Sequence, residues 1–325
     1  MIAVVYHIYC VSDWKEVAKK HLDRLVKSGL YDSADKLYST IINQSNHLTP
    51  LTITEDEVRE FFSNYSKFEL TFGVNHYEYM GIKKVYDICQ EDDWKVLYFH
   101  AKGVSNKYRR HDKQDEISET KVKSILSWKE VMEYFLIDNW NDCINKLEEY
   151  DNVGVTCDNG WFWGNFWWTQ SKHVKTRTEP LCHVGRWYYE AWLNETTRPK
   201  NYEYYKFVFN PYRCSVYKQF YDGTYLGKME DLEIISAYYG SYDIQTDEGR
   251  SPNDNIKEND VSEKIKTFYE LNKSLNNIPI NLEHFGEDPH EGVYKQLRIN
   301  FKVNGFDEIH EICFDDVRNT YLNFI

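Results

Sequence analysis

The sequence predicts an α/β fold in which a mostly parallel sheet flanked by helices is followed by a small β-rich domain. In the first part of the chain, short β-branched and aromatic runs alternate with amphipathic helical patterns, which is typical of doubly wound sheets. From about residue 230 onward, polar stretches rich in turn formers separate alternating strand patterns. We therefore expect a first domain over 1–229 and a β-rich accessory domain over 230–325.

The elements of the first domain follow one another in a regular order. The run 2–11 predicts a strand, and Ser12 is a candidate N-cap for a helix over 13–29 that Gly29 ends. Thr54 is the expected N-cap of the second helix. Strands are further expected over 36–43, 67–75 and 94–103, and helices over 54–65 and 77–91. Ligands of such sheets bind beyond the carboxyl ends of the strands, so functional residues are expected over 6–10, 74–78 and 100–105.

The rest of the chain contains a charged segment, two helical patterns and a hairpin. Segment 106–121 is poor in apolar residues and predicts a surface loop. Helices are expected over 127–150, and a strand over 152–158 leads into an aromatic run. In the second domain we expect a strand over 232–241 and a hairpin over 291–316, with Asn304-Gly305 at its turn.

Length and composition exclude several classes of protein. With 325 residues, 42% hydrophobic and 17% aromatic, the chain can bury a large core. The net charge of -13 argues against a nucleic-acid partner, because nucleic-acid binders need a cationic face. No run approaches the roughly 20 apolar residues that span a bilayer, and the first residues lack the basic flank of a signal peptide. We expect a soluble protein of the cytoplasm without a membrane span.

The cysteines give no sign of a metal site. All 7 are scattered along the chain, without a C-x-x-C pair or a Cys/His group at zinc spacing. We expect them to be reduced thiols that pack as small hydrophobic residues. The sequence therefore assigns no metal ligand.

Segment 160–174, which reads "GWFWGNFWWTQSKHV", is unusually aromatic and fits neither an amphipathic helix nor an alternating strand. Sugars present apolar C–H faces between polar edges, so a sugar site combines aromatic rings with amide, hydroxyl and charged groups. The candidates for contact with a sugar are Gly164, Asn165, Trp167 and Trp168, which the family resemblance given below places on the side of the sugar acceptor. The alternative is that Phe166 and Trp168 are core residues, and we expect about half of the rings to be buried.

Several motifs of the first domain resemble those of one enzyme family. They read "YEYMGIKKVYDIC" over 77–89, "VLYFHAKGVS" over 96–105, "GNFWWTQSKHV" over 164–174 and "RWYYEAWL" over 186–193. The chain is similar over roughly 1–210 to small nucleotide-sugar glycosyltransferases of the GT-A fold, found in bacteria and in large DNA viruses of algae and amoebae. The combination of H-x-K-G with G-N-F-W-W is the specific part of this resemblance.

The resemblance implies a GT-A-like sheet and transfer of a sugar from a UDP- or GDP-sugar to a glycan or glycoprotein acceptor, in viral surface glycan synthesis in the host cytoplasm. The donor would be held by Tyr6, His7, Ile8, Tyr9, Glu78, His100, Lys102 and Gly103. A lysine charge and an open glycine N–H at a strand end can both face a pyrophosphate. The alternative for His100 and Lys102 is that they merely face solvent at a strand end. The alternatives for the whole protein are a non-catalytic carbohydrate-binding protein and an interaction protein with an inactive donor pocket.

Metal dependence stays open, because the chain departs from the family pattern. GT-A enzymes usually carry Asp-x-Asp after the fourth strand, where carboxylates hold Mn²⁺ or Mg²⁺, and here that place reads His100-Ala101-Lys102. Asp92 and Asp93 precede the strand and lie at its other end. Either Asp158 helps to hold an ion, or Lys102 and neighbouring basic residues replace it.

Transfer with inversion needs a carboxylate as general base. Glu190 of "RWYYEAWL" lies in an aromatic setting, which disfavours the charged form of a carboxyl group, and Asp158 is the next candidate. The alternative for Glu190 is an ion pair with Arg186 across one helical turn. A retaining enzyme would need no such base.

The end of the chain carries a second, weaker resemblance. "AYYG" and the stretch from 285 to 305 are similar to a β-rich module appended to some DnaJ-like and viral proteins. The Gly-Asp-Pro of that module is interrupted here by Glu287. The resemblance gives no function for this module, and a structural or partner-docking role is the default interpretation.

Overall fold

The computed structural model of the chain describes residues 1–11, 13–44, 52–101, 119–158, 161–194, 199–204, 232–240, 258–272, 285–286, 289, 295–303 and 309–315. They belong to two compact units, which are described separately. Unit 1 comprises Met1–Gln114 and Lys129–Lys206, and unit 2 comprises Asp115–Trp128 and Phe207–Ile325. The expected domain boundary after residue 229 lies outside the described residues and stays a prediction.

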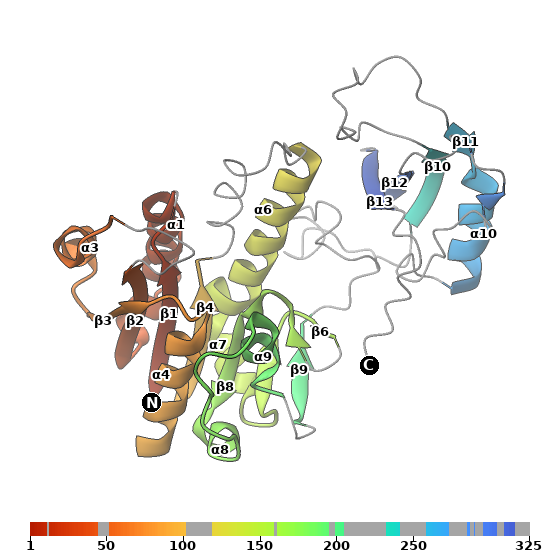
Figure 1. Cartoon of the computed structure of the whole chain (residues 1–325). Coiled ribbons are helices and arrows are strands. Elements are labelled where there is room, and N and C mark those ends of the chain that lie inside the picture. Colours follow the sequence, from red (N-terminus) through yellow and green to blue (C-terminus); the bar gives the residue numbers. More distant parts are fainter. Residues whose placement is uncertain are drawn as a thin grey trace. The chain divides into compact units, whose positions relative to one another are not determined.

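Unit 1 is built on a seven-stranded sheet with the order β3-β2-β1-β4-β8-β5-β9 (Figure 1). The strands are β1 (Ile2–Tyr9), β2 (Lys36–Gln44), β3 (Phe68–Val74), β4 (Lys95–His100), β5 (Asn152–Gly154), β8 (Trp167–Gln170) and β9 (Asn201–Glu203). All neighbours are parallel except β8, which runs antiparallel to both β4 and β5. The predicted α/β fold with a mostly parallel sheet is therefore confirmed.

The strand expected over 152–158 is divided in two. Its first part is β5, and its second part, β6 (Cys157–Asp158), pairs with β7 (Trp161–Phe162) in a separate two-stranded sheet. The aromatic segment therefore begins in this small hairpin and returns to the main sheet with β8.

The helices of unit 1 match the predicted ranges at 13–29, 54–65 and 77–91, whereas the region expected to be helical over 127–150 is divided and several short helices were not predicted. The helices of this unit are α1 (Trp14–Lys27), α2 (Leu30–Ser33), α3 (Glu55–Phe62), η1 (Ser63–Tyr65), α4 (Tyr79–Glu91), α6 (Glu119–Glu133, shared with unit 2), η2 (Tyr134–Asp138), α7 (Trp140–Lys146), η3 (Trp163–Asn165), α8 (Ser171–Val174) and α9 (Arg186–Ala191). Thr54 caps α3 as predicted, accepting a hydrogen bond of 3.2 Å from the Glu57 amide. Ser12 lies outside the described residues, and α6 begins inside the segment expected as a loop.

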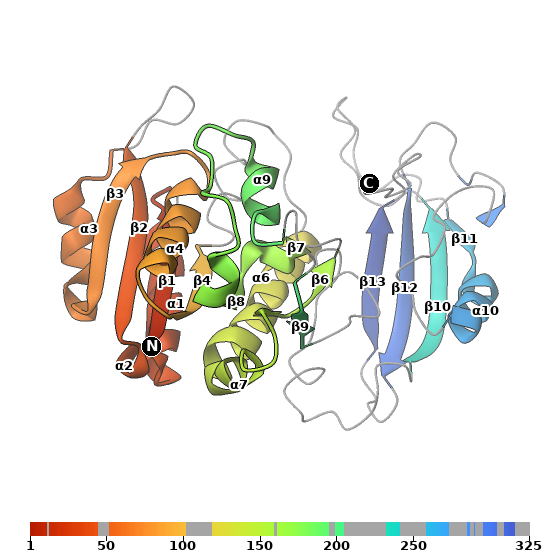
Figure 2. The same ribbon diagram turned by 90° about the horizontal axis from the view of Figure 1, so that it is seen from below.

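Helices cover both faces of this sheet, as can be followed in Figure 2. In β1 the side chains of Ala3 and Val5 pack in the core under α4, together with Trp167 of β8 and Trp192, which follows α9. On the other face Tyr6 stacks on Phe99 of β4, and its hydroxyl meets His21 of α1. Because both faces are covered, the central strands read as continuous apolar runs.

Unit 2 contains a four-stranded antiparallel sheet with the order β11-β10-β12-β13. Its strands are β10 (Leu232–Gly240), β11 (Glu258–Asp260), β12 (Gln296–Val303) and β13 (His310–Asp315). The predicted hairpin pairing of β12 with β13 is confirmed, while its turn at Asn304-Gly305 lies outside the described residues. Helix α10 (Ser262–Asn272), which the sequence analysis did not predict, buries Ile265 and Tyr269, and the Tyr269 hydroxyl accepts from the Leu232 amide at 3.1 Å.

The described helices were also compared with the requirements of a bilayer crossing. None of them, within the part of the chain that the structure describes, combines the length and the apolar character that a crossing needs. A membrane-spanning helix would need about 20 apolar residues in succession.

Candidate functional site

The strand order places a topological switch point between β1 and β4. From β1 the chain builds outward to β2 and β3, and then returns to pair β4 with the other side of β1. Open α/β sheets bind ligands where the connections diverge in this way, beyond the carboxyl ends of the strands. The end of β4 is fixed to β1 because the Ala101 amide donates to the His7 carbonyl at 2.9 Å. We call this side of the sheet, marked by Tyr9, Val74 and His100, the carboxyl edge.

His7 connects three elements at the carboxyl edge. Its side chain is buried, with Nδ1 2.8 Å from the Thr40 hydroxyl of β2 and Nε2 3.0 Å from the Tyr77 carbonyl. Burial lowers the pKa of His7 to about 4, so the ring is neutral at pH 7. A carbonyl oxygen only accepts, so Nε2 carries the proton and Nδ1 accepts from Thr40. His7, predicted to be a donor-site residue, thus holds the connection between β3 and α4 in place.

His100 joins the end of β4 to the aromatic segment. Its Nε2 lies 2.8 Å from the Gly164 carbonyl and donates to it. Gly164 has a φ of 71°, a conformation that glycine adopts without strain. The sequence analysis placed His100 on the donor side and Gly164 on the acceptor side, and the structure brings these two residues together.

Two carboxylates lie near one buried tyrosine close to the carboxyl edge. Burial raises the pKa of the Tyr98 hydroxyl well above its usual value, and the charges of Glu78 and Glu190 raise it further. Glu78 is buried at the N-cap position of α4, and Glu190 belongs to α9. Gly81 permits the close approach of α4, because a Cβ at this position would lie 2.7 Å from Cε2 of Tyr98. Glu78 and Glu190 are therefore neighbours of β4 although they come from different helices.

Glu190 forms the ion pair that the sequence left open as an alternative. Its Oε1 accepts from Nε of Arg186 at 2.8 Å, one helical turn away, and its side chain is 15% exposed. An ion pair positions a carboxylate without excluding proton transfer, so a role of Glu190 as general base stays a prediction. For the other candidate base, Asp158, only the backbone position in β6 is described.

Two predicted donor residues of β1 point away from the carboxyl edge into the core, which corrects the expectation for their side chains. Residues two positions apart in a strand face the same side of the sheet. Tyr6 and Ile8 therefore share one face, and both are fully buried there. The Tyr6 hydroxyl lies 2.8 Å from Nδ1 of His21, whose Nε2 lies 2.8 Å from the Glu133 carboxylate. Tyr6 is thus part of a buried polar network under α1.

The remaining donor predictions differ in what the structure describes. Tyr9 is partly buried at the end of β1. Lys102 and Gly103 lie outside the described residues. Their proposed contacts with a pyrophosphate therefore stay predictions.

The aromatic segment is mostly core. Phe166 and Trp168 are buried, as the alternative interpretation predicted, and Trp167 is buried as well, so the expected exposed sugar platform at Trp167 and Trp168 is wrong. Their exposed fractions are 1% and 0%, since β8 lies inside a sheet that is covered on both faces. The indole N–H of Trp167 donates to Oδ1 of Asn165 at 2.7 Å, and that of Trp168 donates to the Leu136 carbonyl at 2.8 Å. Asn165 is itself 2% exposed, with a φ of 54°. Asn165 therefore turns the chain and accepts the hydrogen bond from the buried indole N–H of Trp167.

A stacked aromatic pair with one exposed ring, which the sequence analysis did not single out, lies nearby. Trp187 of α9 is 62% exposed and stacks on Trp161 of β7, with ring centroids 5.6 Å apart and planes at 25°. The guanidinium of Arg186 lies 5.5 Å from the Trp187 ring centroid. Arg186 therefore contacts both this pair and Glu190. The signal in the sequence was the motif "RWYYEAWL", of which only Glu190 and Arg186 were considered.

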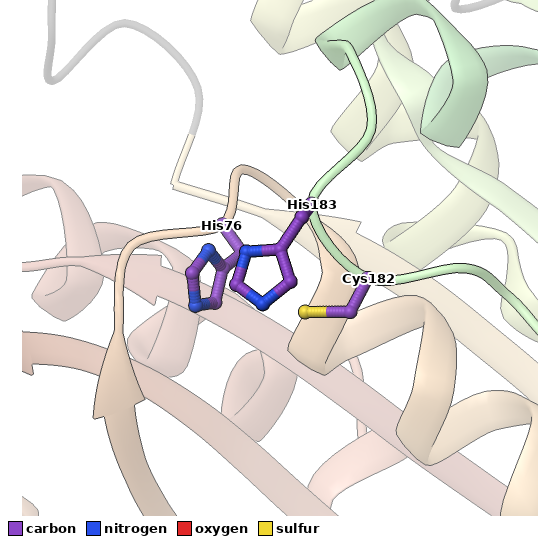
Figure 3. A group of neighbouring side chains, drawn as sticks. All are labelled: His76, Cys182 and His183. Carbon is purple, nitrogen blue, oxygen red and sulfur yellow. The ribbon is translucent and has the colours of Figure 1, made fainter.

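A second group that the sequence analysis missed gathers at the carboxyl edge. His76, in the connection between β3 and α4, faces Cys182 and His183 from the segment between α8 and α9 (Figure 3). One nitrogen or sulfur atom from each of the three residues lies within 4.8 Å of the other two. His76 is far from the other two in the sequence, and only the adjacent pair Cys182-His183 could have drawn attention. Histidine and cysteine are ligands that transition metals prefer.

A hollow of about 520 Å³ lies at the opposite edge of the sheet. Its lining includes the amino terminus, Lys95 and Lys175. Lys95 pairs with Glu148, and Lys175 pairs with Asp93 at 3.0 Å, so their charges are largely neutralised. The lining also includes Lys172, but the hollow lies at the amino ends of β1 and β4, whereas open α/β sheets bind ligands beyond the carboxyl ends of their strands.

Comparisons with known proteins leave the function to be argued from these residues. No protein-family model, no curated protein and no solved structure matches the chain. Fold alone does not define an activity, so function must be argued from the chemistry of the carboxyl edge.

Proposed function

We propose that this chain is a glycosyltransferase that moves a sugar from a nucleoside diphosphate sugar to a glycan or glycoprotein acceptor. The observation that carries the proposal is the convergence of distant motifs at one edge of the sheet. Glu190 lies close enough to Tyr98 of β4 for its charge to raise the pKa of that hydroxyl, and His100 is bonded to Gly164. Three motifs of the family resemblance, over 96–105, 164–174 and 186–193, are therefore neighbours in space.

In this proposal the donor lies at the switch point, with its diphosphate facing the ends of β1 and β4. Lys102 would neutralise the diphosphate, and the resemblance leaves open whether Mn²⁺ or Mg²⁺ assists. The acceptor oxygen attacks the anomeric carbon, the bond to the diphosphate breaks, and the nucleoside diphosphate leaves with the electron pair. Glu190 takes the acceptor proton, and Arg186 positions the carboxylate through their 2.8 Å ion pair.

The acceptor platform is assigned to Trp161 and Trp187 in place of the buried tryptophans of β8. The exposed indole of Trp187, stacked on the partly buried Trp161, offers a flat apolar face to the C–H side of a sugar ring. Arg186, which touches the pair, can donate to sugar hydroxyls. The acceptor would then be held by the same helix that carries the proposed base.

A panel of UDP- and GDP-sugars, titrated calorimetrically with and without Mn²⁺ and assayed for transfer or hydrolysis, tests the proposal. Glu190→Gln keeps size and hydrogen bonding but removes basicity, so turnover should fall by about 100-fold or more with donor binding nearly unchanged. The matched control is Glu149→Gln, an exposed carboxylate after α7, which should leave turnover unchanged. Transfer by Glu190→Gln at the unmutated rate would instead point to Asp158 or to a retaining mechanism.

The exposed Trp187, stacked on Trp161, also favours a second function, namely carbohydrate binding without catalysis. Such a protein would bind glycans but would neither bind nor hydrolyse any nucleotide sugar. Trp187→Ala should weaken acceptor binding in both cases, whereas only an enzyme would lose turnover in Glu190→Gln. The two variants together therefore separate an enzyme from a lectin.

A further inference from the structure

We infer that His76, Cys182 and His183 form a binding site for one zinc ion, with a fourth coordination position open to water or a ligand. The inference does not depend on the proposed sugar transfer. It rests on the convergence of two imidazoles and one thiol from two segments of unit 1 (Figure 3). Among the described residues, no further His, Cys, Asp or Glu belongs to this group.

The spacing of the three side chains is close to that of a zinc site. Zinc binds imidazole nitrogen at about 2.0–2.1 Å and thiolate sulfur at about 2.3 Å in a tetrahedron, which places ligand atoms roughly 3.3–3.6 Å apart. Here the ligand atoms lie within 4.8 Å of one another, and the rings of His76 and His183 have centroids 4.3 Å apart. Small side-chain rotations therefore suffice to reach coordination distance.

The backbone explains how two adjacent residues can serve one ion. In extended backbone, neighbouring side chains point to opposite sides. His183 has a φ of 62°, in the left-handed region that non-glycine residues rarely adopt. The chain turns sharply there, so the Cys182 thiol and the His183 imidazole both face His76 (Figure 3).

His76 is held in position by its neighbours. Tyr77, with a φ of 56°, donates its amide to Oδ1 of Asn75 at 2.9 Å, and its carbonyl accepts from the buried ring of His7 at 3.0 Å. The connection that carries His76 is therefore tied to the end of β1. A metal ligand on a fixed connection loses little conformational freedom when the ion binds.

The chemistry of the three ligands selects the class of metal. Two imidazoles and one thiolate suit Zn²⁺ and chemically similar transition-metal ions, whereas Mg²⁺ and Ca²⁺ require oxygen ligands. Three protein ligands with one open position is the arrangement of reactive zinc sites, whereas structural sites use four protein ligands.

The full-length protein, stripped of metal by a chelator, should bind one equivalent of Co²⁺ with a thiolate-to-cobalt charge-transfer band in the near ultraviolet. Zn²⁺ should displace the cobalt and raise the melting temperature. Cys182→Ser should lose the band, and both Cys182→Ser and His183→Ala should bind Zn²⁺ at least about tenfold more weakly. The matched control is Leu181→Ala, next to the ligands and 60% exposed, which should bind like the unmutated chain.

These measurements separate a true site from adventitious binding by other thiols. Cys10, Cys89 and Cys143 are buried, and the comparison of Cys182→Ser with Leu181→Ala isolates the contribution of Cys182 from every other cysteine. If the unmutated chain fails to bind stoichiometric Zn²⁺, the site does not exist. The same holds if Cys182→Ser and His183→Ala bind Zn²⁺ as tightly as the unmutated chain. Melting curves recorded without metal show whether each variant is folded, and His183→Ala, which keeps every thiol, provides a second measurement of the site.

Discussion

At the scale of single residues, the histidines of the carboxyl edge are held in three different ways. His7 is fixed between Thr40 and Tyr77, and His100 donates to Gly164. His76 and His183 instead face each other, with rings at 78°. Only the last arrangement leaves nitrogen and sulfur atoms converging on one point, which is why the metal site is assigned there and not at His7 or His100.

His7 should give the protein a measurable dependence of stability on pH. Its pKa is about 4 in the folded state against 6.5 for a free histidine, so between these values the unfolded chain binds a proton that the folded chain does not. The free energy of unfolding contributed by this residue is complete above pH 6.5 and falls as the pH drops towards 4. The loss amounts to about 3 kcal/mol. Urea unfolding of the unmutated protein between pH 7 and 4 should show it.

His7→Gln keeps one donor and one acceptor but cannot titrate. We expect this variant to lose most of the pH dependence contributed by His7, while the contributions of His21 and His173, whose pKa values burial also lowers, remain. An equally steep decline in His7→Gln and in the unmutated protein would contradict the assignment. The pKa of His7 would then not be lowered by burial, and other groups would account for the decline.

At the scale of elements, strands and helices with a clear period were predictable and short aromatic elements were not. The run 2–11 contains β1, and the pattern after Thr54 contains α3. Both could be predicted because each element extends over eight residues and shows its period. The segment 161–174 instead contains β7, η3, β8 and α8 in succession. None of these is long enough to show a period, so the sequence could not tell which rings are buried.

Gly81 shows how the packing of one helix shapes the carboxyl edge. A Cβ at this position would lie 2.7 Å from Cε2 of Tyr98 and 3.1 Å from Cβ of His7, and both side chains are buried. Gly81→Ala should therefore destabilise the protein by about 1–3 kcal/mol, even though alanine favours a helix by about 1 kcal/mol over glycine. Chemical denaturation would measure the change.

The matched control for this substitution is Gly185→Ala. A Cβ at Gly185 would meet nothing within 4 Å, and its φ of -66° suits any residue. We expect this variant to differ from the unmutated protein by less than about 1 kcal/mol, because only its N-cap position is affected. Equal losses at both glycines would show that α4 is not closely packed on the sheet.

At the scale of the whole molecule, the contacts that form the site join residues far apart in the sequence. Glu190 lies near Tyr98, and His76 faces Cys182 and His183. Spacing rules find a metal or catalytic group only when its members are close along the chain. The resemblance placed Glu190 among the functional residues, but nothing in the sequence connected His76 with a cysteine that lies beyond five further strands.

Each unit buries a core of its own, so we expect two separable unfolding transitions. Nine of the 10 tryptophans belong to unit 1, the exception being Trp128, so tryptophan fluorescence reports unit 1 almost alone. Leu297→Ala removes a fully buried side chain of β12, which should destabilise unit 2 by about 2–5 kcal/mol. Circular dichroism should detect this loss while the fluorescence transition stays in place. Leu22→Ala, at a fully buried position of α1, should do the reverse by shifting the fluorescence transition. If Leu297→Ala shifts both signals together, the two units unfold as one.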